Sequence, residues 1–322
     1  MTLSAKPLLR VEGLKKYFPV RRGYLQRVGS YVRAVDGVDL TIQPHQTLGL
    51  VGESGCGKST VARLILRLLN PDDGTVQFDG REITALTERA FKPLRKQIQM
   101  IFQDPYSSLN PRMTVAQSIS DGVRMAGIKN KSDQRKRIRQ LLDMVGMPAA
   151  SAGRYPHEFS GGQRQRVGIA RALSVSPKLV LCDEPISALD VSIQAQIINL
   201  LKDLQAELGL SYLFISHDLN VVSYICDYVC VMYRGRIVES APATVLFDKP
   251  CHPYTLNLLA AVPEATEVGW SPQVGAELQR AVLPDGCAFG DQCPDYGDDC
   301  KHEPADMVKV GDGHYVRCWN AA

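Results

Sequence analysis

The sequence GLVGESGCGKST, which begins at Gly49, combines glycines with a lysine and a serine at a spacing that can bind phosphate groups. Its glycines allow the backbone to curl so that successive N–H groups point at phosphate oxygens, and the helical pattern that follows adds the positive end of its dipole. Lys58 can reach the outer phosphates, and the Ser59 hydroxyl can be a ligand of Mg²⁺. We therefore expect a nucleotide-binding loop made of Gly52, Glu53, Ser54, Gly55, Cys56, Gly57, Lys58, Ser59 and Thr60.

Two adjacent carboxylates follow another apolar run, in the sequence LVLCDEP. Asp183 ends the expected strand, where it can hold Mg²⁺ directly or through water, and Glu184 can polarise an attacking water. Neighbouring strand residues point to opposite faces, but the chain turns at a strand end, so both side chains can reach one site. Alone, such a pair is typical of an ordinary strand end; together with a phosphate-binding loop it predicts nucleotide hydrolysis.

A pair of glycines begins a long helical pattern in the sequence FSGGQRQRVGIARAL. Ser160, Gly161 and Gly162 are expected at the N-terminus of this helix, where free N–H groups and a serine hydroxyl can hold an anion. The other interpretation is a simple helix cap. These residues alone leave both open.

Short apolar runs alternate with longer helical patterns between about residues 8 and 240, which predicts an α/β domain with a mainly parallel central sheet. One helix is expected from about Val191 to Leu208, because isoleucines and leucines recur there at spacings of three and four residues and can pack on the sheet. The expected strands are Thr47–Val51, Ile98–Gln103, Leu179–Asp183, Ser211–Ser216 and Val229–Tyr233.

Residues 110–175 are expected to be mostly helical, and the basic run KNKSDQRKRIRQ within them is typical of a solvated helix face or loop. We interpret about 105–175 as an inserted helical subdomain. Beyond residue 240, repeated prolines interrupt the helical periodicity. The sequence therefore predicts a nucleotide-binding domain over 1–240 and a C-terminal region over 241–322.

The composition argues against several other classes of protein. The 322 residues carry 37 lysines and arginines against 34 aspartates and glutamates, and a net charge of +3 is too small to indicate nucleic acid as the partner. No apolar run approaches the roughly 18 residues of a membrane-spanning helix, and the start has no apolar leader, so we expect a cytosolic chain. Its nine cysteines are then expected to be thiols or metal ligands rather than disulfides.

Five motifs in order, GESGCGKST, FSGGQ, LCDEP, SALD and ISHD, resemble those of the ATPase subunits of ATP-binding-cassette (ABC) transporters over about residues 8–240. The resemblance implies an α/β, ABC-type P-loop fold with a mainly parallel core sheet, an antiparallel β subdomain and an inserted helical subdomain. It also implies that two such domains pair head to tail and bind ATP between them. The residues that would serve ATP held mainly by the partner are Ser160, Gly161, Gly162 and Gln163.

The same resemblance implies roles for single residues. Gln103 matches the glutamine that contacts Mg²⁺ or the attacking water in this family. His217 matches the histidine near the γ-phosphate, and Asp190 matches the aspartate at the dimer interface. Catalytic roles thus fall to Glu184, His217 and Gln103. The implied Mg²⁺ ligands are Ser59, Gln103 and Asp183.

An aromatic ring near the N-terminus stacks on adenine in this family. Phe18 aligns best with that ring, and the adjacent Tyr17 is the alternative.

Four of the cysteines, Cys287, Cys293, Cys300 and Cys318, lie in the last 36 residues. Four thiolates can bind Zn²⁺ or an iron–sulfur cluster, but without a CxxC pair the spacing decides neither, and unligated thiols are a third possibility. This tail, the segment HPYT and the segment PYSSLNPR after Gln103 resemble the ATPases of dipeptide and oligopeptide permeases, above all the dipeptide subunit. That resemblance implies a 4Fe-4S cluster. We expect its metal–thiolate bonds to stabilise a tail that has few apolar residues, and a redox-sensing role for the cluster is the alternative.

The resemblance therefore implies an ATP hydrolase, with ATP and Mg²⁺ as cofactors, that powers the import of dipeptides or short oligopeptides. The implied partners are a second, nonidentical ABC ATPase, two transmembrane permease subunits and, indirectly, an external peptide-binding protein, with no nucleic acid. We expect a peripheral subunit at the cytoplasmic face of the cell membrane. The alternative is a soluble ABC ATPase of DNA repair or translation, a class that typically carries large insertions or two fused cassettes.

Overall fold

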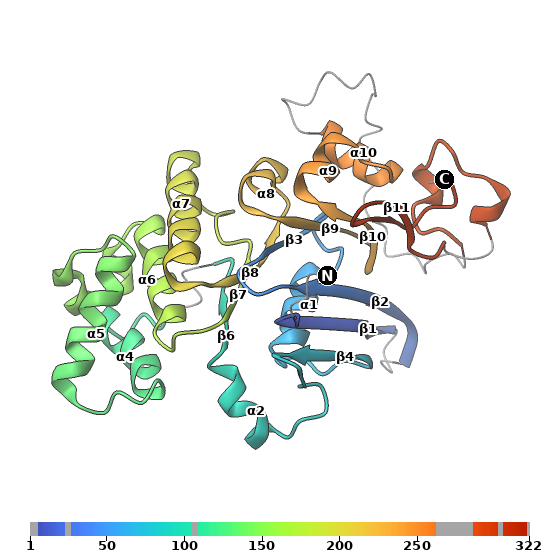
Figure 1. Ribbon diagram of the computed structural model, residues 1–322. Helices are drawn as coiled ribbons and strands as arrows, with labels where there is room; N and C mark the ends of the chain where they lie inside the picture. Colours follow the sequence, from blue (N-terminus) through green and yellow to red (C-terminus); the bar gives the residue numbers. More distant parts are fainter. Residues whose placement is uncertain (1–5, 23–26, 105–108, 262–285, 302–304, 321–322) are drawn as a thin grey trace. The chain divides into compact units, whose positions relative to one another are not determined.

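The computed structural model describes residues 6–22, 27–104, 109–261, 286–301 and 305–320, and these form two compact units (Figure 1). The first unit consists of Met1–Thr41, Leu48–Thr84 and His217–Ala322, and the second of Ile42–Thr47 and Ala85–Ser216. The chain thus passes from the first unit into the second and back twice, over Ile42–Thr47 and over Ala85–Ser216. As a result, the glycine-rich loop and the C-terminal cysteines belong to the same unit.

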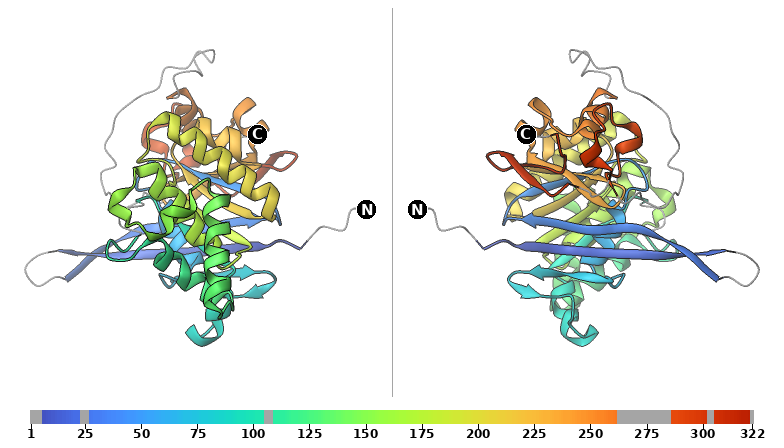
Figure 2. Two further views of the ribbon diagram at one scale, coloured as in Figure 1. Left: turned by 90° about the vertical axis from the view of Figure 1, so that its left-hand side faces the viewer. Right: turned by 90° about the vertical axis from the view of Figure 1, so that its right-hand side faces the viewer.

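One sheet of the first unit has the strand order β2-β1-β4-β5. β1 pairs antiparallel with β4, with Leu9 opposite Phe78, and β4 pairs antiparallel with β5. The long strands β1 and β2 lie side by side (Figure 2). This sheet confirms the antiparallel β subdomain; its strands are β1 (Leu9–Arg22), β2 (Arg27–Ile42), β4 (Asp73–Phe78) and β5 (Arg81–Glu82).

The other sheet strands of the first unit follow the order β11-β12-β10-β9-β3. β3 and β9 are parallel, whereas β9, β10, β12 and β11 pair antiparallel in turn. All five residues of β3 are buried, as expected of an apolar strand covered on both faces. The C-terminal hairpin therefore extends the sheet that carries β3; the bounds are β3 (Thr47–Val51), β9 (Tyr228–Tyr233), β10 (Arg236–Pro242), β11 (Val308–Gly311) and β12 (His314–Val316).

Helices of the first unit follow the strands closely. α1 (Lys58–Ile65) begins directly after the glycine-rich loop, and α8 (Leu219–Ile225) precedes β9. α9 (Ala243–Asp248) and α10 (Pro253–Ala260) come after β10. The prolines beyond residue 240 thus separate short helices rather than preventing them, since Pro253 occupies the first turn of α10, where proline is tolerated.

The second unit contains parallel strands in the order β8-β7-β6. These are β6 (Ile98–Ile101), β7 (Leu179–Asp183) and β8 (Ser211–Ser216). α7 (Val191–Leu208) buries isoleucines and leucines at the predicted spacing. The five predicted strands and the predicted helix are confirmed, with β6 ending two residues earlier and β9 beginning one residue earlier than expected.

The remaining helices of the second unit are α2 (Glu88–Arg95), α4 (Val115–Met125), α5 (Lys131–Met144) and α6 (Gly161–Leu173), with the 3-10 turns η1 (Ala149–Gly153) and η2 (Pro156–Glu158). α4, α5 and α6 pack together (Figure 1). Most charged residues of the basic run are exposed on α5, while Ile138, Leu141 and Leu142 of the same helix are buried. Within the described ranges, none of the helices combines the length and apolar character needed to cross a membrane.

Candidate nucleotide and cysteine sites

The glycine-rich loop joins β3 to α1 along a path that only glycine permits. Gly52 has φ = 148° and Gly57 has φ = 117°, conformations that other residues rarely adopt. A Cβ atom at Gly52 would lie 2.1 Å from the carbonyl oxygen of Met232, and one at Gly57 would lie 2.0 Å from that of Ala34. The loop therefore runs against neighbouring backbone, which fixes its shape before any ligand binds.

Lys58 is held inside this loop. Its side chain is 4% exposed, and Nζ donates hydrogen bonds of 2.6 Å to the carbonyl oxygen of Gly52 and 2.8 Å to that of Glu53. The first turn of α1 contains no acidic residue, so the positive end of the helix dipole is not neutralised there. An ammonium group and a helix N-terminus thus combine at one loop, an arrangement suited to a polyphosphate.

Two contacts that the sequence analysis did not foresee support the loop from outside. The backbone N–H of Glu53 donates a 2.9 Å hydrogen bond to the hydroxyl oxygen of Tyr254 in α10. The N–H of Gly235 donates one of 2.9 Å to the carbonyl oxygen of Cys56. Tyr254 belongs to the HPYT segment, which entered the sequence analysis only through the family resemblance and carried no signal for this contact.

Tyr17 and Phe18, the two candidates for stacking on adenine, have different surroundings. The Tyr17 hydroxyl donates to Asp36, whose other oxygen accepts bonds of 3.0 and 2.8 Å from Arg236. Burial, reinforced by Asp36, raises the pKa of Tyr17 to about 12. Phe18 is 37% exposed, with the Lys16 ammonium 5.8 Å from its ring centre. Only Phe18 therefore presents an exposed ring.

Asp36 is itself a charged group in a buried place. Burial acts to raise the pKa of this carboxyl, but hydrogen bonds from Tyr17 and Arg236 and the charges of Arg236 and Arg33 outweigh it, and the pKa falls below its usual value. Asp36 therefore stays ionised and ties β2 to β10.

In the second unit, Gln103 meets Glu184. Nε2 of Gln103 donates a 3.0 Å hydrogen bond to Oε2 of Glu184. Glu184 follows β7 with φ = 45°, and its N–H donates to the carbonyl oxygen of Ile215 at 3.0 Å. This left-handed residue is the predicted turn at the strand end: it leaves Asp183 buried and Glu184 half-buried.

The signature segment forms a helix cap. Ser160 Oγ accepts the N–H of Gln163, and the Gln163 side-chain oxygen accepts the N–H of Ser160, a reciprocal capping box at the start of α6. A Cβ at Gly162 would lie 2.5 Å from Cγ2 of Ile193 in α7, so α6 and α7 approach closely there. Asp190 is the exposed N-cap residue of α7 and its side chain makes no capping bond. The capping interpretation is confirmed, and the anion-binding one stays a prediction.

His217 directly follows the last residue of β8 and is exposed. Its role near a phosphate therefore remains a prediction.

All four C-terminal cysteines are free thiols that line one pocket in the first unit. The Cys287 N–H donates a 2.8 Å bond to the carbonyl oxygen of Cys300, and Cys318 follows β12. η3 (Gly290–Gln292) and η4 (Asp298–Cys300) are the only regular elements between Cys287 and Cys300. Burial raises the pKa of the Cys287, Cys293 and Cys318 thiols, as expected for neutral thiols removed from water.

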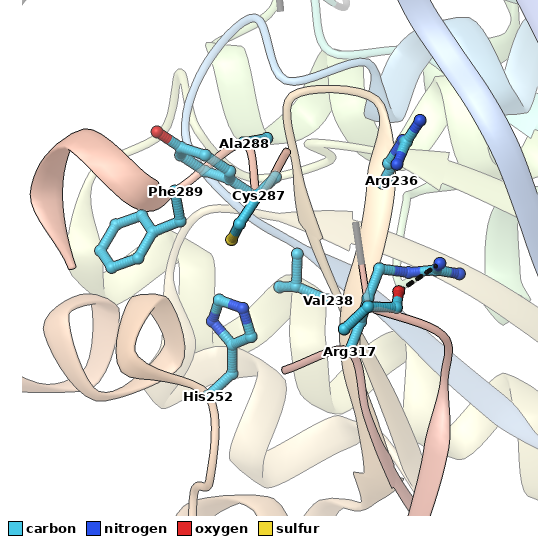
Figure 3. Close-up of a pocket in the computed structure, with 9 residues that line it drawn as sticks. Arg236, Val238, His252, Cys287, Ala288, Phe289 and Arg317 are labelled. Atoms are coloured by element: carbon cyan, nitrogen blue, oxygen red, sulfur yellow. Dashed lines mark hydrogen bonds between the residues drawn. The ribbon is translucent and has the colours of Figure 1, made fainter. Parts of the chain in front are cut away.

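A neighbouring pocket adjoins Cys287. In Figure 3 the Cys287 thiol and the His252 ring face its interior, and Arg317 lies at its side. The Arg317 guanidinium donates to the carbonyl oxygens of Ile237 and Ala305, so Cys318, the next residue, is anchored to β10.

The donor chemistry of the four thiols limits the groups that they could hold. They line one pocket, and four thiolates can bind either Zn²⁺ or an iron–sulfur cluster. Within the described residues, the set of three ligand-type side chains found within 4.8 Å of one another is Glu239, Cys251 and His314, not the tail cysteines.

Comparison with known proteins gives consistent results along the chain. A family model described as "ABC transporter" matches residues 35–187, and one described as "Oligopeptide/dipeptide transporter, C-terminal region" matches residues 238–300. The oligopeptide transport ATP-binding protein AppF of Bacillus subtilis is 46% identical over 98% of both chains. A probable peptide ABC transporter ATP-binding protein, y4tS, of Sinorhizobium fredii is 48% identical over 97% of this chain and 89% of its own.

Among solved structures, the dimeric ATP-binding cassette MJ0796 in a post-hydrolysis state bound to ADP and Pi superimposes with a TM-score of 0.65 and 28% identity. The match covers 73% of this chain and 98% of that one.

Proposed function

We infer the activity of this chain from the family to which it belongs, the ATP-binding subunits of oligopeptide and dipeptide ABC transporters. It is an ATP-hydrolysing subunit of a peptide importer. The observation that carries this conclusion is the 46% identity to AppF over 98% of both chains, a length that spans both the nucleotide-binding motifs and the C-terminal region. The matched C-terminal region argues against the soluble alternative in DNA repair or translation.

The phosphate loop binds the phosphates of ATP in this proposal. Lys58, oriented by the carbonyl groups of Gly52 and Glu53, neutralises charge on the outer phosphates, and the remaining loop residues, Ser54, Gly55, Cys56, Gly57, Ser59 and Thr60, complete the cradle. Phe18 stacks on the adenine, supported by its exposed ring. Mg²⁺, when bound by Ser59, Gln103 and Asp183, supplies charge neutralisation of the transferring phosphoryl group.

Glu184 acts as the base that orients or deprotonates the attacking water, and Gln103 fixes its carboxylate. The 3.0 Å bond between these side chains supports this assignment. His217 contacts the γ-phosphate.

A second, nonidentical ATPase completes the site from outside the chain. Ser160, Gly161, Gly162 and Gln163 serve the ATP held by that partner, and Asp190 lies at the interface with it. The exposure of Ser160 and Gln163 supports this, as does the dimeric arrangement reported for the cassette MJ0796.

The chain works as a peripheral subunit at the cytoplasmic face of the membrane, bound to two transmembrane permease subunits that receive peptide from an external binding protein. Residues 1–240 form the nucleotide-binding domain, with about 105–175 as its helical subdomain, and 241–322 the C-terminal region. The two family matches, at 35–187 and 238–300, support a boundary near residue 240.

Cys287, Cys293, Cys300 and Cys318 hold a 4Fe-4S cluster in this proposal. Their convergence on one pocket supports a shared ligand, and the choice of a cluster over the alternative, Zn²⁺, rests on the resemblance of the tail to that of the dipeptide permease ATPases. Such a cluster supplies four metal–thiolate bonds that tie together a segment with little regular structure.

The importer function is tested by measuring peptide uptake into cells that lack the gene for this chain and express either the unmodified chain or a variant of it. Glu184→Gln is expected to lower uptake and the ATPase rate of the purified transporter by about 10²–10⁴-fold, the usual size of a general-base effect, while ATP still binds. Glu207→Gln, the same change on the exposed face of α7, is the matched control. Normal uptake with Glu184→Gln would contradict the assignment.

The cluster is tested by iron and sulfide analysis of anaerobically purified protein. We expect about four irons per chain, lost in Cys300→Ser and retained in Cys251→Ser, which changes an exposed thiol outside the tail. One zinc and no iron per chain would favour the alternative metal.

A further inference from the structure

A cluster of buried rings connects the cysteine tail to the phosphate loop. The ring centre of Tyr254 lies 4.4 Å from that of Tyr233 and 5.7 Å from that of Phe289, and Phe289 meets both tyrosines edge to face. All three side chains are at most 2% exposed. Phe289 comes two residues after Cys287, beside His252 (Figure 3). Such packing leaves the Tyr254 ring a single orientation.

Hydrogen bonds also fix the backbone at the start of α10, the helix that carries Tyr254. Glu239, fully buried in β10, accepts hydrogen bonds from the N–H groups of Cys251 (2.8 Å) and His252 (2.9 Å), and a third from Nε2 of His314 (2.7 Å). His252 Nδ1 in turn accepts the N–H of Tyr254 at 3.0 Å and caps the helix. The start of α10 is thereby tied to the sheet.

Tyr254 uses this support to hold one residue of the phosphate loop. Its hydroxyl oxygen accepts the N–H of Glu53 at 2.9 Å, and the carbonyl oxygen of the same residue accepts the Lys58 ammonium at 2.8 Å. Glu53 is therefore held at both of its backbone polar groups. A shift of its peptide would move an acceptor that orients the lysine.

We propose that Tyr254 is a positioning residue for ATP binding: it fixes Glu53, and through it Lys58, in a geometry ready for phosphate, and Phe289 of the cysteine tail holds its ring in place. The C-terminal region thus contributes directly to the nucleotide site. This role of Tyr254 rests on the proposed function, in which the glycine-rich loop binds the phosphates of ATP.

The test compares Tyr254→Phe with Tyr233→Phe in the full chain. Each removes one hydroxyl from the same ring cluster, and of these two hydroxyl groups it is that of Tyr254 that accepts the N–H of Glu53. Tyr254→Phe is expected to raise the Kd for Mg-ATP about three- to tenfold, the effect of losing one hydrogen bond of ordinary net strength. Tyr233→Phe is expected to leave it within about twofold.

Amide hydrogen exchange at Glu53 separates positioning from general destabilisation. The exchange of this single N–H is expected to be faster in Tyr254→Phe and unchanged in Tyr233→Phe. In the assembled transporter the KM for ATP should rise by the same factor as the Kd, while kcat is retained. The reason is that the hydrogen bond between Tyr254 and Glu53 is present both in the ATP-bound ground state and in the transition state. Unchanged Kd and unchanged Glu53 exchange in Tyr254→Phe would overturn the proposal.

Phe289→Leu tests the ring support independently, because it keeps the hydroxyl. It should speed Glu53 exchange less than Tyr254→Phe does, and add nothing to the Kd of the Tyr254→Phe variant. Additive effects of the two changes would refute the link through Phe289. If the unmodified chain itself failed to bind Mg-ATP, the proposed function would be at fault; binding that is insensitive to Tyr254 would refute this inference alone.

Discussion

The side-chain amide of Gln103 donates a 3.0 Å hydrogen bond to the carboxylate of Glu184, which joins the segment after β6 to the end of β7. The two residues are 81 positions apart in the sequence and meet because β6 and β7 are neighbouring parallel strands whose carboxyl ends share one edge. A carboxylate that accepts a hydrogen bond from a neutral donor is held in one orientation, and a base for water requires a fixed orientation.

Gln103→Ala is expected to lower the ATPase kcat of the assembled transporter about tenfold, because a hydrogen bond to a charged group contributes on the order of 1.5–3 kcal/mol and part of that orientation survives through the backbone. Steady-state kinetics checks this, with Gln134→Ala, which removes an amide bonded to the Ile128 carbonyl oxygen, as control. Equal turnover in the two variants would show that the bond has no part in hydrolysis.

Gly162→Ala is expected to lower the ATPase rate of the assembled transporter about tenfold or more, because its Cβ would lie 2.5 Å from Ile193 and displace the start of α6. Mg-ATP binding to the single chain should be retained, since this segment serves the ATP of the partner. Gly153→Ala is the control, because a Cβ there meets nothing within 4 Å. Partial rescue by Ile193→Ala would establish the clash as the cause; loss of ATP binding to the single chain would contradict the assignment.

Phe18→Ala is expected to weaken Mg-ATP binding about 5- to 100-fold, because base–aromatic stacking is worth about 1–3 kcal/mol per base. Phe18→Trp should retain binding, since it keeps a ring. Tyr17→Phe, which leaves the ring in place and removes the bond to Asp36, should not change the Kd. Calorimetric titration of these three variants and of Tyr17→Ala decides between the two aromatic residues; a stronger loss in Tyr17→Ala than in Phe18→Ala would reverse the assignment.

Asp36→Asn is expected to lower the free energy of unfolding at pH 7 by about 1.5–3 kcal/mol, because it removes the charged partner of Arg236. The pKa of Asp36 is depressed in the folded protein, so its stabilisation is fully present above about pH 4, the pKa in the unfolded chain, and disappears as the pH falls through the folded value. Urea unfolding between pH 3 and 7 measures the difference. Asp298→Asn, at an exposed ion pair, should show no comparable dependence.

The strands and the long helix α7 followed from the sequence because hydrophobic periodicity is a local property. The runs Leu179–Asp183 and Ser211–Ser216 are apolar enough to require burial on both faces, and the structure buries every residue of both. The capping box at Ser160 likewise involves only four consecutive residues, so local sequence is enough to predict it. The order of motifs added the family, because that order is also a property of the linear chain.

The phosphate loop, the acidic pair, the helix that begins at the signature glycines and the group of four cysteines can thus all be predicted from the linear sequence. Which groups meet follows only from the folded chain: Tyr17 bonds to Asp36 while Phe18 stays exposed, and Tyr254 reaches Glu53 across 201 positions of sequence. A side chain's partner depends on strand register and on which distant segments return to the same unit. No local pattern encodes those choices, because they minimise the free energy of the whole packed chain.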